Sequence, residues 1–132
     1  MSEENVELVR RGIEAFNRRD LRASLALWSD DAEVDWSRSN GPLKGVYRGH
    51  RGLESFWHEF WSTFESVEIE AHGFRQTDSQ VVVPNTAYMR GRDGIEVVAK
   101  SAFVFTLEHG LTTRLQMFQE QAEALEAARL SE

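Results

Sequence analysis

The residues that could do chemistry are few and stand mostly in the second half of this 132-residue chain. Asn85, Ser101, Arg114 and Gln116 are polar positions within segments rich in valine and aromatic residues. A guanidinium can polarise a carbonyl or pair with an anion, and a hydroxyl or an amide can hydrogen-bond a ligand oxygen. A few polar groups in apolar walls are typical of small-molecule sites.

Other kinds of site lack the required residues or the required spacing. The chain has no cysteine, which excludes disulfides and thiolate chemistry. His58 and Glu59 begin like the helix of a zinc protease, but Ser62 stands where the second histidine must be. The other histidines show no ligand spacing. We therefore expect neither a metal nor a cofactor.

Helices are predicted for the first part of the chain. Val6, Val9, Ile13 and Phe16 recur at helical spacing. Asp20 is a good N-cap for a second, short helix, whose inner face would carry Leu21, Leu25 and Trp28. Residues 32–36 alternate like a strand, and the glycine-rich residues 37–52 predict a loop. A third helix with a broad aromatic face follows over residues 53–64.

The remainder of the chain predicts a β meander. Strand-like segments cover residues 66–76, 79–91, 95–107 and 111–119, and turn signals lie at 78–79, 92–94 and 108–110. Ala122, Leu125 and Ala128 indicate a short closing helix. With no linker or repeat, the chain predicts one α+β domain over residues 1–132.

Composition restricts the partners. The formal net charge is −7, which disfavours nucleic acid and anionic membranes. No apolar run approaches the roughly 20 residues that span a bilayer. The acidic, polar N-terminus is unlike a signal peptide, and the expected location is the cytoplasm.

Four stretches, in order, resemble the SnoaL-like (polyketide cyclase-like) branch of the NTF2-like superfamily. They are WSDDAEVDW at 28–36, YRGHRGL at 47–53, FVF at 103–105 with the turn at Gly110, and AEALEAA at 122–128. The resemblance implies a cone-shaped NTF2-like, cystatin-like roll. In it, N-terminal helices pack on a curved antiparallel sheet around a pocket. The superfamily includes isomerases, cyclases, dehydratases and epoxide hydrolases as well as binding modules, so the fold does not decide the chemistry.

The catalytic positions of ketosteroid isomerase, a member of that superfamily, are not kept. By the resemblance, its carboxylate base falls on Trp36, and strand alternation sends the neighbouring Asp35 to the other face. A second acidic position of the superfamily falls on Ser101, and the isomerase's phenol falls near Gly12. The remaining catalytic candidates are Arg114 and Ser101, which could polarise a carbonyl, and Asp35, a poorly placed base.

The resemblance also implies a set of ligand-binding residues. Ser101 and Phe103 share one face of their strand, and the last strand is expected to present Arg114, Gln116 and Phe118 to the concave side. The full set is Trp36, Trp57, Trp61, Asn85, Met89, Ser101, Phe103, Arg114, Gln116 and Phe118. The alternatives are that the aromatic residues are core, that Arg114 reaches solvent at a strand end, and that Asn85 and Gln116 satisfy backbone groups.

Two functions remain open from the sequence. The first is a SnoaL-like protein that binds a small, largely apolar, oxygenated molecule, with isomerisation, cyclisation or hydration as the reaction class. The second is a non-catalytic module for ligand binding or dimerisation. In either case we expect a homodimer through the convex face of the sheet, to which Tyr88 and Val104 would contribute.

Overall fold

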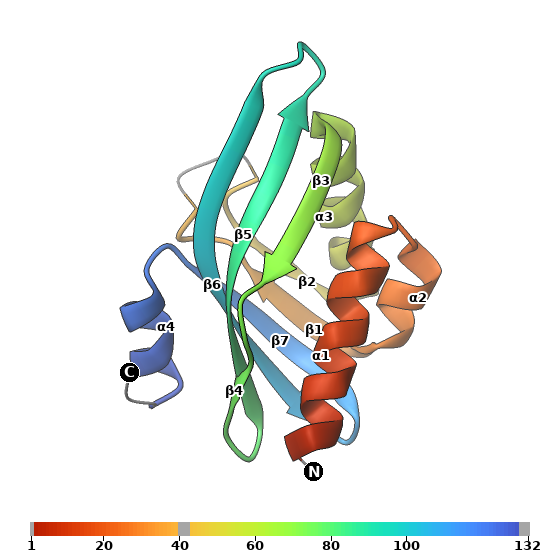
Figure 1. Ribbon diagram of the computed structural model, residues 1–132. Coiled ribbons are helices and arrows are strands. Elements are labelled where there is room, and N and C mark those ends of the chain that lie inside the picture. The colour runs from red at the N-terminus through yellow and green to blue at the C-terminus, as the bar shows by residue number, and fades with distance from the viewer. Residues whose placement is uncertain (1, 40–42, 130–132) are drawn as a thin grey trace.

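The computed structural model describes residues 2–39 and 43–129, which form helices packed on a strongly curved sheet (Figure 1). The elements are α1 (Ser2–Asn17), α2 (Leu21–Ala26), β1 (Trp28–Asp35), β2 (Val46–Arg48), α3 (Gly49–Thr63), β3 (Phe64–Ala71), β4 (Arg75–Gln76), β5 (Gln80–Gly91), β6 (Glu96–Glu108), β7 (Leu111–Phe118) and α4 (Gln121–Ala127). None of the described helices has the length and apolar character needed to cross a membrane.

The strands of the described chain form one open, seven-stranded sheet. Its order is β2-β1-β7-β6-β5-β3, and β4 pairs with β5. The expected α+β cone is confirmed. The sheet is mixed rather than wholly antiparallel, because β1 and β7 run parallel while the other neighbouring pairs are antiparallel. The β5–β6 hairpin extends well beyond the other strands, at the top of Figure 1.

Helices cover both faces of the sheet unequally. Among the described helices, α1 and α3 lie over the concave face, whereas α4 is the one that packs on the convex face (Figure 1). Alternate residues of β5 belong to the cores on opposite faces of the sheet. Val81 and Val83 are part of the large concave core, and Val82 is part of the smaller convex core. In the convex core, Val82 packs with Val104, Phe118 and the α4 residue Leu125.

Two predicted boundaries in the N-terminal half are wrong. Asp20 does cap α2, since its Oδ1 accepts a hydrogen bond from the Ala23 amide at 3.0 Å. The helix ends at Ala26, however, and Trp28 opens β1 because it pairs with Thr112 of β7. The predicted loop over residues 37–52 also contains β2, and α3 begins at Gly49 rather than Leu53.

The β6–β7 hairpin sets which residues of β7 face inward. His109 and Gly110 have φ values of 54° and 78°, so both turn residues adopt the left-handed conformation of a tight hairpin. Leu107 pairs with Thr112, but Thr106 pairs with Arg114, because β7 carries a bulge there. One extra residue exchanges the two faces of the strand beyond it. Leu115 and Met117 therefore face the concave side with Phe103 and Phe105.

The convex core makes α4 a structural element rather than a loose tail. Leu125 is 1% exposed, so Leu125→Ala should lower the free energy of unfolding by about 2–5 kcal/mol through the cavity it leaves. Urea denaturation measures this change. The matched control is Glu126→Ala on the exposed side of the same helix, for which we expect a change within about 0.5 kcal/mol. Equal effects of the two variants would contradict the packing of α4 on the sheet.

Candidate functional site

A cavity of about 490 Å³ opens on the concave side of the sheet. We call it the large cavity. Its volume lies within the range of roughly 300–1,000 Å³ that is usual for small-molecule sites. The walls come from β3, β5, β6, the end of β7, the end of α3 and the segment after β1. The lining residues are Trp36, Ser39, Phe60, Thr63, Phe64, Ile69, Asn85, Ala87, Met89, Val97, Ala99, Lys100, Ser101, Phe103, Met117 and Gln119.

Two neutral polar side chains form a pair in the wall of the large cavity. Asn85 and Ser101 are cross-strand partners on β5 and β6, and Ser101 Oγ donates to Asn85 Oδ1 at 3.3 Å. Asn85 Nδ2 donates to the Val83 carbonyl at 3.1 Å, and Asn85 is only 2% exposed. A side-chain amide has two N–H donors and two acceptor lone pairs. The Asn85–Ser101 pair therefore retains capacity for a ligand oxygen.

The described lining residues of the large cavity include no aspartate, glutamate, histidine, tyrosine or arginine. Lys100 is part of the lining, but Ala99 and Ser101 on either side of it face inward, so alternation directs its side chain to the convex face. Within the described residues, no group of three or more potential metal ligands gathers either. The site can thus donate and accept hydrogen bonds, and it presents no described side chain that titrates near neutral pH.

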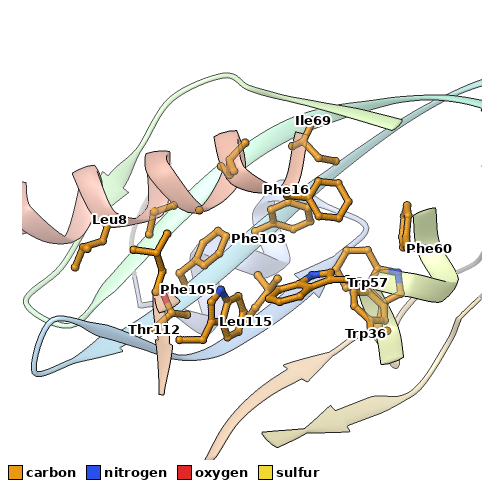
Figure 2. A pocket seen from close by; sticks show the side chains of 16 residues that line it. Leu8, Phe16, Trp36, Trp57, Phe60, Ile69, Phe103, Phe105, Thr112 and Leu115 are labelled. Carbon is orange, nitrogen blue, oxygen red and sulfur yellow. The ribbon is translucent and has the colours of Figure 1, made fainter. Parts of the chain in front are cut away.

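A second, small cavity of about 60 Å³ lies beneath α1 and α3. Figure 2 shows aromatic side chains from both helices and the sheet converging on it. Trp28 and Trp57 meet edge to face there, with ring centroids 5.6 Å apart, and Thr112 is its one polar lining residue among those described. Gly12 of α1, where the resembling isomerase would carry a phenol, also lines this cavity.

Five of the expected binding residues line the large cavity, namely Trp36, Asn85, Met89, Ser101 and Phe103. Their role in binding stays a prediction. Trp57 lines the small cavity instead. Trp61 lines neither described cavity: it packs in the core against Phe16, with ring centroids 5.6 Å apart, and its buried indole N–H has no hydrogen-bond partner in the structure.

The expectation that Arg114, Gln116 and Phe118 face the pocket is wrong. The bulge in β7 places all three on the convex face, since they pair there with Thr106, Val104 and Ala102. Arg114 contacts two carboxylates of β1, with Nε 3.2 Å from Glu33 Oε2 and a terminal nitrogen 3.6 Å from Asp35 Oδ2. Phe118 is buried beneath α4 in the convex core.

Asp35 is held as a carboxylate on the convex face. Burial works to raise its pKa, but hydrogen bonds from the side chain and backbone of Ser37, the charge of Arg114 and a hydrogen bond from Gln116 outweigh burial. The net effect lowers the pKa of Asp35 below its ordinary value. Asp35 therefore serves the ion-pair network with Arg114, and it does not reach the cavity as a base.

Several lining residues had no role in the sequence-based site. Met117 and Gln119 enter the large cavity because of the bulge, which no turn signal indicates. Gln119 Nε2 donates to the Arg38 carbonyl at 3.1 Å, tying the end of β7 to the segment after β1. Phe60 of α3 could have been identified from its place in the aromatic face of that helix.

Comparisons with known proteins agree on the architecture. The SnoaL-like domain matches residues 9–115 of this chain. An NTF2-like protein of unknown function from Burkholderia pseudomallei is 25% identical, with a TM-score of 0.79 over 93% of this chain and 95% of that one. TerC, crystallised with polyporic acid, is 20% identical, with a TM-score of 0.79 over 93% and 96%.

A third similar structure is a Mycobacterium tuberculosis protein in complex with estradiol-17β-hemisuccinate. It is 13% identical, with a TM-score of 0.78 over 91% of this chain and 95% of that one. At such low identity, the TerC and M. tuberculosis structures show the shared fold and no more. A search of curated proteins gives no significant match.

The ion-pair network of Arg114, Glu33 and Asp35 on the convex face predicts that the stability of the protein depends on pH. Because the pKa of Asp35 is lowered in the folded state, its contribution is present near neutral pH and is lost as the pH falls below about 4. Asp35→Asn should reduce the free energy of unfolding at neutral pH by roughly 1–3 kcal/mol. The variant should also lose less stability than the parent between neutral and acid pH.

Urea denaturation across that pH range measures the effect. Asp78→Asn, at an exposed aspartate of the β4–β5 turn, is the matched control and should follow the parent profile. If the free energy of unfolding of Asp35→Asn changed with pH in parallel with that of the parent, the stabilising role of Asp35 in the network would be contradicted.

Proposed function

The chain belongs to the SnoaL-like domain family, and within it we propose that this protein binds a small, largely apolar, oxygenated molecule in the large cavity. The apolar part of the ligand would contact the aromatic and aliphatic walls. Its oxygen would hydrogen-bond the Asn85–Ser101 pair. Walls of this kind with one precisely placed polar pair combine affinity with orientation.

The observation that carries this proposal is the incomplete hydrogen bonding of a buried amide. Asn85 is 2% exposed, and each of its two polar atoms has one described partner. Burying hydrogen-bonding capacity without a partner is unfavourable, so a ligand carbonyl or hydroxyl at this position would be stabilising. The surrounding residues Ala87, Ala99 and Met89 leave room beside the pair, because they are small or flexible.

Ligand binding is favoured over catalysis by a side-chain base. The hypothesis of an isomerase, cyclase or hydratase relied on Arg114, Ser101 or Asp35. Of these, only Ser101 lies in the large cavity, and its hydroxyl does not titrate near neutral pH. What Asn85 and Ser101 can do is hold and polarise a ligand carbonyl.

Two solved structures that share this fold contain a small molecule. TerC was crystallised with polyporic acid, and the M. tuberculosis protein with an estradiol ester. For this chain, the apolar walls and the Asn85–Ser101 pair favour a compact ring or chain compound with a carbonyl or hydroxyl group.

Pairing of two copies through the convex face is a second proposal with its own observation. Tyr88 and Val98, opposed on β5 and β6, are 44% and 62% exposed beyond the area that α4 covers. Exposed apolar residues side by side on a sheet favour an interface. Val104, the other residue expected there, is 1% exposed because it lies in the convex core with Leu125 of α4, so it does not take part.

The Asn85–Ser101 pair predicts a selective loss of affinity. Asn85→Leu should lower the affinity for an aromatic ketone about tenfold, because the variant loses a hydrogen bond to the ketone oxygen. The affinity for the matching hydrocarbon should not change. Tryptophan fluorescence titration measures both affinities, since Trp36 lines the large cavity. The control, Thr86→Val, removes a buried hydroxyl next in sequence on the opposite face and should bind both compounds as the parent does. Equal weakening of ketone and hydrocarbon would exclude the pair as the anchor.

The convex-face proposal predicts dissociation by a single charge. Val98→Glu should convert a dimer to a monomer, because it places a charge in the centre of an apolar contact. Sedimentation velocity over a concentration series measures this change. Val46→Glu is the matched control: Val46 is an exposed valine on β2, at the opposite end of the strand order from β3. A parent protein that is monomeric at every concentration would refute the dimer.

A further inference from the structure

Four of the described residues line both the large cavity and the small one. Trp36, Phe60, Ile69 and Phe103 are the lining residues that the two cavities share. We call these four residues the partition. On one side of it lies the Asn85–Ser101 pair, and on the other lie residues of α1 together with Trp28 and Trp57. The partition therefore stands between the polar anchor and an unfilled apolar space.

The inward-facing residues of β6 run from the large cavity to the small cavity. Its inward residues come in steps of two: Ala99 and Ser101 line the large cavity, Phe103 lines both cavities, and Phe105 lines the small cavity alone. Each step of two residues advances about 7 Å. A ligand whose oxygen is held at Ser101 thus meets the ring of Phe103 one step further in.

Ring contacts brace Phe103 in this position. Its ring centroid lies 5.7 Å from that of Trp36 and 5.9 Å from that of Phe105, and Trp36 in turn meets Phe60 edge to face at 6.1 Å. Figure 2 shows Phe103, Trp36 and Phe60 among the side chains that line the small cavity. Aromatic pairs in such arrangements resist displacement, so the partition acts as a fixed wall.

Gly12 contributes to the space behind the partition. It stands inside α1, where glycine is less favourable than alanine by about 1 kcal/mol of helix propensity. Its φ is not in the left-handed region. A Cβ there would meet, outside its own helix backbone and chain neighbours, only Leu27 Cδ1 at 3.9 Å. Neither backbone geometry nor crowding thus requires glycine, and its missing side chain leaves part of the small cavity open.

We propose that Phe103 is the residue that sets the maximum length of the ligand. The wild-type protein admits an apolar chain from the Asn85–Ser101 pair up to the partition and no further. The small cavity is a latent extension of the same site, closed off by the Phe103 ring. This inference rests on the proposed function and names the feature of the ligand that the site measures.

The test uses straight-chain 2-ketones that lengthen by one methylene at each step. For the parent protein, affinity should rise about fourfold per methylene until the chain reaches the partition, and then stop rising. Phe103→Ala should move this limit to longer ketones, and Phe103→Leu should move it by roughly two methylenes while keeping the core better filled. Isothermal titration calorimetry measures each affinity, and urea denaturation establishes that each variant is folded.

Two further variants locate the added length. Phe105→Leu makes the same change one step further along β6, where it enlarges only the small cavity. This variant should not change the ketone length at which affinity stops rising. Gly12→Ala added to Phe103→Leu should take back about one methylene of the gain, because the new methyl occupies the small cavity. An unchanged limit in both Phe103 variants, or a gain that Gly12→Ala does not reduce, overturns the inference.

The outcomes separate this inference from the proposed function. If no ketone of any length binds the parent protein, the proposed function fails and the length limit fails with it. If ketones bind and Asn85→Leu weakens them, but the Phe103 variants keep the parental limit, only the role of Phe103 is refuted.

Discussion

The register between β6 and β7 is the constraint on which the site depends. The tight turn at His109 and Gly110 would by itself pair Phe103 with Gln116. The bulge in β7 shifts the pairing by one residue, so that Phe103 lies opposite Met117 instead. Thr113 Oγ1 donates to the Thr106 carbonyl at 3.2 Å across this irregularity. Because a shift of one residue exchanges the faces, the bulge replaces an arginine and a glutamine in the cavity by Leu115 and Met117.

The same register places charged side chains on the convex face and leaves neutral polar side chains on the concave face. On the convex side, Arg114 reaches Glu33 and Asp35, and its own side chain is 43% exposed, so the guanidinium keeps part of its hydration. On the concave side the polar pair is neutral, and a neutral amide is far less costly to bury than a guanidinium. A cavity lined by Asn85 and Ser101 can thus stay largely apolar and still orient an oxygenated ligand.

Much of the fold was predictable because it follows from local patterns. The amphipathic spacing of α1, the Asp20 cap and the turns at 78–79, 92–94 and 108–110 are short-range signals that the structure keeps. Alternation also places Asn85 with Met89, and Ser101 with Phe103, on one face of their strands, and the family resemblance assigns these faces to the inside. Trp28 was misplaced because its strand pairing with Thr112 is a contact between distant segments, which helical spacing cannot reveal. Arg114, Gln116 and Phe118 were misplaced for a related reason: a bulge is a property of two strands together, and β7 alone alternates equally well on either face.

The core beneath α1 and α3 contains many aromatic side chains, yet these side chains leave the small cavity unfilled. An unfilled apolar space of about 60 Å³ forgoes packing contacts there. A glycine inside α1 forgoes about 1 kcal/mol relative to alanine. Both costs fall directly behind the partition, whereas the convex core under α4 is closed by residues such as Ala124 and Leu125 that are 0% and 1% exposed. Since a protein needs only to stay above a stability threshold, this forgone stability is tolerable next to a binding site. It leaves the length of that site dependent on the single ring of Phe103 and its two aromatic neighbours.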